Sequence, residues 1–497
     1  MSDQLIERSR ELLDRAEAAF SGLPGVEALN LARARLDGPL RVAIAGKVKA
    51  GKSTLLNALV GDRLAPTDTG ECTKIVTWYQ DGHTYQVLLH PRDGSPAQQV
   101  RFQRDDGAID VDLGGRDPLE VDRLSITWPS SSLRRITLID TPGIDTLSEQ
   151  VGQRAFEFLD PKDAETPADA VLYLMKHVHV SDLRLLEAFH DEAVSQPNPV
   201  NAIAVLSRAD EVGSGRMDAM GSARKIAARY GRDARLRSLV QMVLPMAGLL
   251  AETAETLTER EYQQLAQLAT VPRPVIEAHL LSADRFINAP PETPLTDLER
   301  EALLGRFGIF GIRQSLALLR SKSVTSSVEL AEELARRSGL NELQTVLTTL
   351  FIDRATVLKA RSALLTVERL CEENSHNPAS ADLLLGIEQI MAGAHPFNEL
   401  ATLASVRTGR IKARDEDLFD LERTLGSTGT AAWQRLDLPE STPDAELLTA
   451  GYTAIGRWQR LAESPLTSYD LAQAARVAIR SLEEIVARLS AAQQQQG

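Results

Sequence analysis

Residues 46–53 read Gly-Lys-Val-Lys-Ala-Gly-Lys-Ser and match the pattern G-x-x-x-x-G-K-[ST] in full. An apolar segment typical of a strand, residues 40–45, precedes the pattern, and a helical segment, residues 54–59, follows it. In this context, backbone N–H groups and the N-terminus of the helix bind phosphate oxygens. A chance match in a loop is the alternative, and the strand and helix on either side argue against it. The residues expected to bind phosphate are Gly46, Lys47, Val48, Lys49, Ala50, Gly51, Lys52, Ser53 and Thr54.

Asp-Thr-Pro-Gly, residues 140–143, ends a later apolar segment and is expected to complete the phosphate site. We expect Lys52 to contact the β- and γ-phosphates and the Ser53 hydroxyl to bind Mg2+. Asp140 is then placed to hold Mg2+ through water, and the N–H group of Gly143 to contact the γ-phosphate. The two motifs together favour a switch-type GTPase over a generic ATPase.

The candidate first switch lies between these motifs, at residues 66–74, Pro-Thr-Asp-Thr-Gly-Glu-Cys-Thr-Lys. Thr73 is the residue that we expect to bind Mg2+ and to hold the attacking water, by its hydroxyl or its backbone. Thr67, Thr69 and Thr77 remain alternatives for this role.

Recognition of the base is expected from residues 206–210, Leu-Ser-Arg-Ala-Asp, which end another apolar segment. Asp210 is able to accept hydrogen bonds from the N1–H and the exocyclic amine of guanine, a donor pair that adenine lacks. The usual GTPase pattern has Asn or Thr and then Lys, where this chain has Ser207 and Arg208. An Arg guanidinium is able to lie flat on a purine, although the departure leaves adenine as the alternative base. The final loop on the base side is expected at residues 244–248, Leu-Pro-Met-Ala-Gly, with Ala247 and Gly248 as its nucleotide-binding residues.

The pattern of apolar residues predicts an α/β head followed by helices. Apolar strand-like segments alternate with helical segments between residues 40 and 244, which predicts a mostly parallel sheet. Short runs within residues 75–130, separated by Asp-Gly and Gly-Gly turns, predict hairpins added to one side of the sheet. Helical stripes cover residues 4–20, residues 341–371 and the chain from residue 469. We therefore expect the two ends of the chain to meet in one all-α bundle.

Composition narrows the function classes. The formal net charge of −14 disfavours a nucleic-acid binder, since such proteins are usually basic. The two cysteines, Cys72 and Cys371, have no metal-ligand spacing and fit a reducing, cytoplasmic compartment. The best uncharged apolar window, residues 238–251, is shorter than the roughly 20 residues that a spanning helix needs. Any membrane contact is therefore expected to be peripheral.

The motifs together resemble those of bacterial dynamin-like proteins, in particular the isoniazid-inducible GTPases of the IniC type. Besides the motifs above, Ser-Arg-Ala-Asp-Glu-Val-Gly and Arg-Phe-Gly-Ile-Phe-Gly-Ile-Arg carry the resemblance over most of the chain. It implies N-terminal neck helices (1–39), a dynamin-type GTPase domain (40–318), and a helical neck and short trunk (319–497). It further implies GTP as substrate, Mg2+ as cofactor, nucleotide-driven pairing of heads, membrane association, and a role in envelope stress or drug tolerance.

The resemblance also assigns roles to single residues. Ile144 stands where small GTPases carry a water-positioning Gln, so catalysis is expected to depend on Thr73, backbone groups and a cation. Lys49 occupies the position at which eukaryotic dynamins have a small polar residue that helps to hold a monovalent cation. A Lys ammonium there would replace that cation; the alternative is a solvated side chain. The loop expected to contact a partner head contains His177, His179 and Asp182.

A cationic loop is the candidate site for lipid contact, since basic residues near a bilayer bind anionic lipid. The alternative is a solvated loop that pairs with Glu416 and Asp417. No larger hydrophobic paddle is evident in the sequence, so two functions stay open. One is a GTPase acting at the cytoplasmic membrane, and the other is a GTP-regulated scaffold or partner subunit for a longer dynamin-like protein. The residues of the candidate lipid loop are Arg407, Arg410, Ile411, Lys412 and Arg414.

Overall fold

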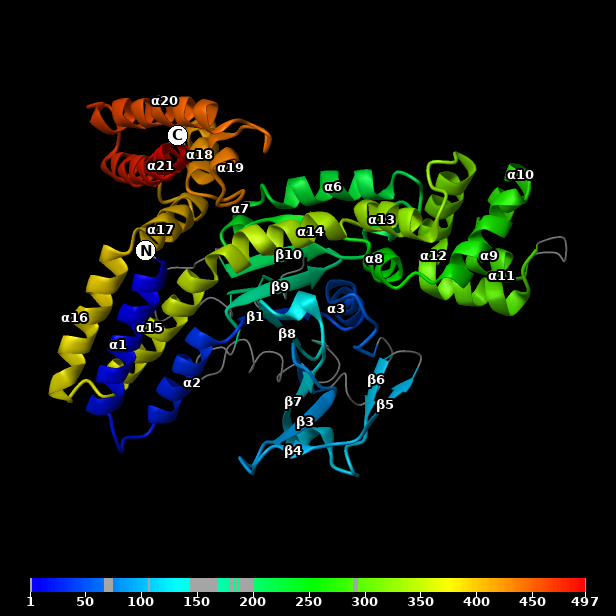
Figure 1. The fold of residues 1–497 in the computed structure, drawn as a ribbon, viewed down its shortest axis with the longest axis horizontal. Helices are drawn as coiled ribbons and strands as arrows, with labels where there is room; N and C mark the ends of the chain where they lie inside the picture. The colour runs from blue at the N-terminus through cyan, green and yellow to red at the C-terminus, as the bar shows by residue number, and fades with distance from the viewer. Residues whose placement is uncertain are drawn as a thin grey trace.

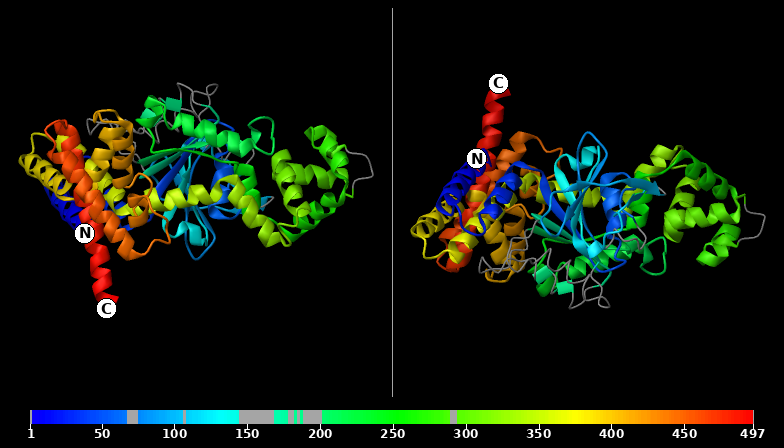
Figure 2. Two further views of the ribbon diagram at one scale, coloured as in Figure 1. Left: turned by 90° about the horizontal axis from the view of Figure 1, so that it is seen from above. Right: turned by 90° about the horizontal axis from the view of Figure 1, so that it is seen from below.

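The computed structural model describes residues 2–66, 75–105, 108–143, 168–177, 182–183, 186–187, 201–288 and 294–496. A sheet lies at the centre, a bundle of helices at one end and a smaller helical arm at the other (Figure 1). Helices cover both faces of the sheet, and the last helix extends past the rest of the bundle (Figure 2). The predicted combination of an α/β head and an all-α region is confirmed.

The main sheet has nine strands in the order β11-β10-β9-β1-β8-β2-β7-β3-β4. The first five strands of this order are mutually parallel and nearly all of their residues are buried, as expected for a sheet covered on both faces. Their carboxyl ends lie at one edge, so the motifs that follow them are brought together. These strands are β1 (Leu40–Gly46), β8 (Ile136–Asp140), β9 (Ala170–Met175), β10 (Ala202–Leu206) and β11 (Val243–Pro245).

The additional strands extend one side of this sheet, as predicted, although not simply as hairpins. Strand β2 pairs antiparallel with β8 and parallel with β7, so its neighbours are distant in the chain. Strands β3 and β4 do form an antiparallel pair, and β5 and β6 form a separate two-stranded sheet. The bounds are β2 (Val76–Gln80), β3 (Gln86–Pro91), β4 (Gln98–Gln99), β5 (Phe102–Asp105), β6 (Ala108–Val111) and β7 (Val121–Thr127).

The hydrophobic core of the head continues past residue 318, the predicted end of the domain. Leu330, Leu343 and Phe351 are buried in the same core as the sheet, and that core reaches Leu358. The predicted helix over residues 341–371 is interrupted by a π-helical turn and a 3-10 turn, so it is not continuous. The helices of the head are α3 (Lys52–Val60), α6 (Ala219–Tyr230), α7 (Ala234–Arg237), α8 (Gly248–Glu255), α13 (Ser327–Ser338) and α14 (Leu340–Val346), followed by the turns η6 (Leu347–Phe351) and η7 (Ile352–Arg354).

The helical arm was not predicted as a separate unit. Its longest helix, α12, bends at Gly308, whose φ of 61° lies outside the helical region. Among the described residues, α12 alone has the length and composition of a membrane span, with a mean hydropathy of 1.3. Half of that window is buried against the protein, and α12 contacts α8, α9 and α11, which is typical of a core helix. The arm comprises α9 (Glu259–Thr270), α10 (Arg273–His279), α11 (Ala283–Ile287) and α12 (Asp297–Arg320).

Both ends of the chain meet in the bundle, as predicted. Leu5, Leu12, Ala16 and Phe20, the expected stripe of the first helix, are all buried in its core. Helices α1 and α2 lie beside α15, and α1 also contacts α16 (Figure 1). The bundle comprises α1 (Ser2–Ala19), α2 (Val26–Asp37), α15 (Ala355–Glu373), α16 (Pro378–Gly393), α17 (His395–Arg407), α18 (Asp415–Thr424), α19 (Ala432–Leu436), α20 (Asp444–Glu463) and α21 (Tyr469–Gln496).

The candidate lipid loop lies at the junction of head and bundle, so the prediction is wrong for two of its residues. Arg407 is buried, and its guanidinium donates to the carbonyl oxygens of Val240, at 3.2 Å, and of Gln241 in the head. It also forms an ion pair with Glu422 at 3.5 Å. Ile411 is buried in the core of the bundle. Neither residue is at an exposed tip, because the head covers one and the bundle covers the other.

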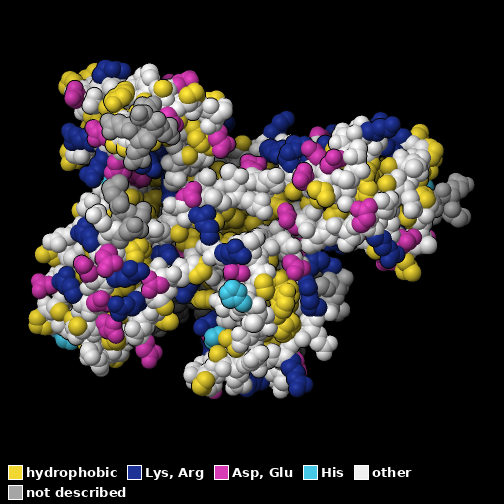
Figure 3. Space-filling model, in the orientation of Figure 1, with side chains coloured by type: hydrophobic (Ala, Val, Ile, Leu, Met, Phe, Trp, Pro, Cys, Tyr) yellow, Lys and Arg dark blue, Asp and Glu magenta, His cyan; other side chains and the backbone are white. Residues whose placement is uncertain are grey.

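The remaining cations of this loop are on the surface. Arg410 and Lys412 are exposed, and Arg414 forms an ion pair with Asp417 at 2.9 Å, as the alternative interpretation expected. On the face shown in Figure 3, acidic and basic side chains are interspersed over α1, α15 and α16 rather than gathered by sign.

Candidate functional site

The loop between β1 and α3 has the geometry of a phosphate-binding loop. Gly46 ends β1 with a φ of 148°, and a Cβ atom there would lie 2.5 Å from the carbonyl oxygen of Leu174 on β9. Only glycine avoids this contact, so the first glycine of the motif is required by the packing of β1 against β9. Helix α3 begins at Lys52, with Gly51 as its N-cap, and its N-terminus therefore faces the loop.

Lys52, Ser53 and Asp140 converge at the carboxyl edge of the sheet. The Nζ of Lys52 lies 3.4 Å from the carbonyl oxygens of Gly46 and Lys47, inside the loop. The Ser53 hydroxyl donates to Asp140 Oδ2 at 3.2 Å. Burial lowers the pKa of Lys52, and burial raises the pKa of Asp140 to about 6 against the opposing charge of Lys52. The site therefore holds a cation and a carboxylate that are both poorly solvated.

These residues fit Mg2+. Among the described residues, Asp140 Oδ1 is buried and has no hydrogen-bond partner. An unpaired carboxylate oxygen beside a hydroxyl is a suitable pair of ligands for Mg2+, which prefers oxygen. No cluster of three His, Cys, Asp or Glu side chains suited to a metal occurs in the parts of the chain that the structure describes.

Gly143 lies against the phosphate-binding loop. A Cβ atom at this position would be 2.7 Å from Val48 Cγ2 and 3.1 Å from Lys52 Nζ. The backbone of Gly143 is therefore close to the Lys52 ammonium, where we predicted a contact with the γ-phosphate.

The predicted base motif lines a cavity of about 210 Å³ together with the phosphate-binding loop. Asp210 and Ser207 line it, and the Ser207 hydroxyl is buried with no hydrogen-bond partner among the described residues. Burial raises the pKa of Asp210, and Glu211 adds to this while Arg208 opposes it. Of the predicted nucleotide-binding residues, the cavity is lined by Ala50, Gly51, Thr54, Ser207, Arg208, Asp210 and Gly248.

Arg208 connects the base motif to the phosphate-binding loop. It has a left-handed backbone, with a φ of 53°, and its guanidinium donates to the carbonyl oxygen of Lys49 at 3.0 Å. The same guanidinium pairs with Glu211 at 2.7 Å. Lys49 is itself left-handed, with a φ of 61°, and its side chain is exposed. Arg208 thus connects the base motif to the phosphate-binding loop. The base motif alone gives no sign of this contact, because Lys49 is distant in the chain.

Six further residues line the cavity beyond those predicted to bind the nucleotide. Glu211 directly follows Asp210, so its position was the available signal. Met246 lies in the predicted base-side loop, next to Ala247. The other four are apolar residues whose side-chain direction only the fold determines. The six residues are Leu55, Leu174, Val205, Glu211, Met246 and Leu249.

Several predicted residues lie outside the described part of the chain: Thr67, Thr69, Thr73, Ile144 and His179. Thr77, the remaining switch alternative, is buried in β2 opposite Asp140, and its hydroxyl donates to the carbonyl oxygen of Ile75 at 3.3 Å.

Two of the residues predicted to contact a partner head lie in the described part of the chain, and one of them is buried. His177 is exposed. Asp182 is buried, accepts a hydrogen bond from the Tyr173 hydroxyl at 2.7 Å and pairs with Lys47 Nζ at 3.2 Å. The prediction that Asp182 faces a partner head is therefore wrong for this structure, because the carboxylate binds the phosphate-binding loop of its own chain.

Comparison with known proteins identifies the family. A sequence profile of the dynamin family matches residues 42–206. Isoniazid-induced protein IniC of Mycobacterium tuberculosis H37Rv is 37% identical over 492 residues, which are 98% of this chain and 99% of that protein. The chain belongs to the dynamin family, as an IniC-type protein. The predicted resemblance is confirmed, and this dynamin-like protein is a GTPase.

Two other relatives match about a quarter of the chain. Isoniazid-induced protein IniA of the same organism is 37% identical over 133 residues, which are 25% of this chain and 20% of IniA. A bacterial dynamin-like protein of Nostoc punctiforme is 31% identical over 153 residues, which are 27% of this chain and 22% of that protein.

Proposed function

We propose that this dynamin-like GTPase uses Mg2+ and couples the pairing of two heads to a movement of the bundle at the cytoplasmic membrane. The observation that carries the nucleotide part of the proposal is the cavity shared by the phosphate-binding loop and Asp210, together with the contact between Ser53 and Asp140. The pairing of heads and the membrane are expectations of the family resemblance. The partner head belongs to a second copy or to a related dynamin-like protein. A role in envelope stress or drug tolerance follows from the likeness to an isoniazid-induced protein alone.

In this proposal Ser53 and Asp140 hold Mg2+, which supplies positive charge to the β- and γ-phosphates when bound. Lys52 adds a second cation from inside the loop, where its contacts with Gly46 and Lys47 keep it close to the phosphates. The N–H group of Gly143 contacts the γ-phosphate, and Thr73 holds the attacking water. The buried site strengthens each of these electrostatic contacts, because little water competes with them.

The alternative is a GTP-regulated scaffold or a partner subunit of a longer dynamin-like protein. The 133 residues matched in IniA are a smaller share of IniA than of this chain, so IniA is the longer protein. The burial of Arg407 and Ile411 removes two of the five residues proposed to contact lipid, which favours this alternative over direct membrane remodelling.

The proposal is tested by measuring GTP turnover against protein concentration. We expect the specific activity to rise with concentration, because pairing of heads completes each site, and we expect excess ATP not to compete. The Lys52→Ala variant, which lacks the ammonium group proposed to bind phosphate, gives the background rate of turnover. Binding of GTP with negligible turnover at every concentration would instead support the scaffold.

A variant of Lys49 tests the internal cation. We expect Lys49→Ala to lose turnover by about tenfold in buffer without potassium or sodium. A preorganised charge stabiliser in a water-excluded site contributes roughly a hundredfold or more, and the side chain of Lys49 is exposed, so a smaller loss is expected. Added potassium should restore part of the loss, whereas the unaltered protein should not respond to it. Full turnover of Lys49→Ala without either cation would rule out this role.

A further inference from the structure

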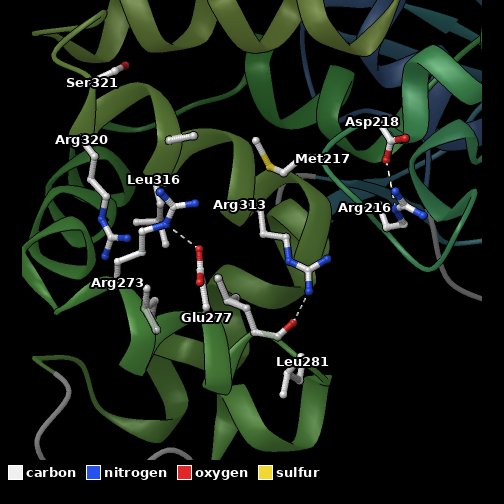
Figure 4. A pocket seen from close by; sticks show the side chains of 13 residues that line it. Arg216, Met217, Asp218, Arg273, Glu277, Leu281, Arg313, Leu316, Arg320 and Ser321 are labelled. Atoms are coloured by element: carbon white, nitrogen blue, oxygen red, sulfur yellow. Dashed lines mark hydrogen bonds and ion pairs between the residues drawn. The ribbon is translucent and has the colours of Figure 1, made fainter.

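A second cavity, of about 730 Å³, lies between the helical arm and residues 216–218, and Figure 4 shows the side chains that line it. It shares no lining residue with the nucleotide cavity. Its walls are α10, the end of α12 and residues 216–218, which precede α6. This volume is within the range of small-molecule sites, which are mostly apolar with a few placed polar groups. The apolar part of the lining is Met217, Ile276, Leu280, Leu281, Leu316 and Ala317.

The charged part of the lining is mainly basic. Four arginines line the cavity, against the two carboxylates of Asp218 and Glu277. Arg273 pairs with Glu277 at 2.6 Å, and Arg216 pairs with Asp218 at 3.2 Å. In the part of the chain that the structure describes, no carboxylate pairs with the two arginines of α12 that line the cavity, so positive charge among the lining residues is in excess by two.

These two arginines, Arg313 and Arg320, are held in place by carbonyl oxygens. Arg313 donates to Gly215, at 2.6 Å, and to Leu280, at 2.7 Å. Arg320 donates to the carbonyl oxygens of Ala269 and Val271. Carbonyl oxygens orient a guanidinium without neutralising it. The cavity therefore combines an apolar wall with fixed, uncompensated positive charge.

We propose that this cavity binds an amphipathic anion, whose alkyl chain lies on the apolar wall and whose carboxylate or phosphate group lies against the arginines. The exposed apolar residues at the site agree with such a ligand, since Leu281 is 65% and Met217 is 48% exposed. Burying these side chains under an alkyl chain is favourable, and a guanidinium binds carboxylate or phosphate better than any neutral head group. A cationic amphiphile is excluded by the same excess of charge.

The test uses the full-length protein and monomeric dodecyl phosphate below its micelle concentration, with binding measured by isothermal titration calorimetry. We expect saturable binding, and no binding of dodecyltrimethylammonium. Arg216 and Arg273 are 71% and 79% exposed, so their removal should not unfold the arm. Arg216→Ala combined with Arg273→Ala should weaken binding by about tenfold. The control is Arg260→Ala, because Arg260 is also 79% exposed but does not line the cavity.

Ala317→Trp gives an independent test of the apolar wall, since Ala317 is an exposed residue of α12 that lines the cavity. The larger side chain should fill the site and abolish binding while leaving the circular dichroism spectrum unchanged. Equal binding of the cationic amphiphile, or unchanged affinity in both the double arginine variant and Ala317→Trp, would overturn the proposal. A second experiment with phosphatidylglycerol vesicles distinguishes the two sources of such a ligand. Binding to vesicles as well as to dodecyl phosphate supports a membrane lipid. Binding to monomeric dodecyl phosphate alone supports a free amphiphile.

Discussion

Replacement of Asp210 by Ala should weaken GTP binding by about a hundredfold, while the weak binding of ATP stays the same. In the proposed function the half-buried Asp210 carboxylate, which lines the cavity, accepts two hydrogen bonds from guanine. Hydrogen bonds to a charged group contribute roughly 1.5–3 kcal/mol each, so a loss of about 3 kcal/mol is a cautious expectation. Titration of a fluorescent guanine nucleotide, with ATP as competitor, measures both effects.

Glu211→Ala is the matched control, because it removes the neighbouring carboxylate of the same cavity. Glu211 is 56% exposed and pairs with Arg208, so we expect its loss to change affinity by less than about fivefold. Asp210→Asn extends the test, since its amide donates a hydrogen bond where the carboxylate accepts one. This variant should prefer xanthosine triphosphate. Similar losses for Glu211→Ala and Asp210→Ala would show that Asp210 does not select the base.

The nucleotide site was predictable because its signals are local in the sequence. Gly46 and Gly51 lie five residues apart in one loop, and each motif directly follows a strand whose apolar run is easily recognised. Parallel strands place their carboxyl ends at one edge, so Asp140 and Asp210 were expected near the loop. The meeting of the two chain ends was predictable for a similar reason, since the stripe of α1 needed an apolar partner.

Other features depend on contacts between residues far apart in the chain, and the sequence offered no signal for them. Arg407 looked like an exposed cation, because nothing near it in the chain shows that Val240 and Gln241 would accept its hydrogen bonds. Ile411 looked like a membrane anchor for the same reason. The helix over residues 341–371 had a continuous apolar stripe, yet its earlier residues, as far as Leu358, pack in the core of the head, and most of its later residues pack in the core of the bundle.

The second large effect is expected at Arg407, where the bundle contacts the head. Arg407→Ala should destabilise the protein by about 3 kcal/mol, because removal of one partner from a buried ion pair leaves polar groups without compensation. The groups affected are Glu422 and the carbonyl oxygens of Val240 and Gln241. Glu422 keeps its ion pair with Arg237, which is why we expect the lower end of the usual range. The midpoint of urea denaturation, followed by circular dichroism, measures the change.

Arg410→Ala is the control for this variant, since Arg410 is an exposed cation three residues away, and its removal should change stability by less than about 0.5 kcal/mol. Equal midpoints for the two variants would mean that Arg407 is solvated and that the junction is not formed in solution. A lower midpoint for Arg407→Ala would show that this contact holds the bundle against the head. Val240 and Gln241 precede β11, and β11 leads to Ala247 and Gly248, the residues predicted for the base side of the nucleotide site. Arg407, together with the ion pair between Arg237 and Glu422, would then connect the bundle to the strand that leads to this site.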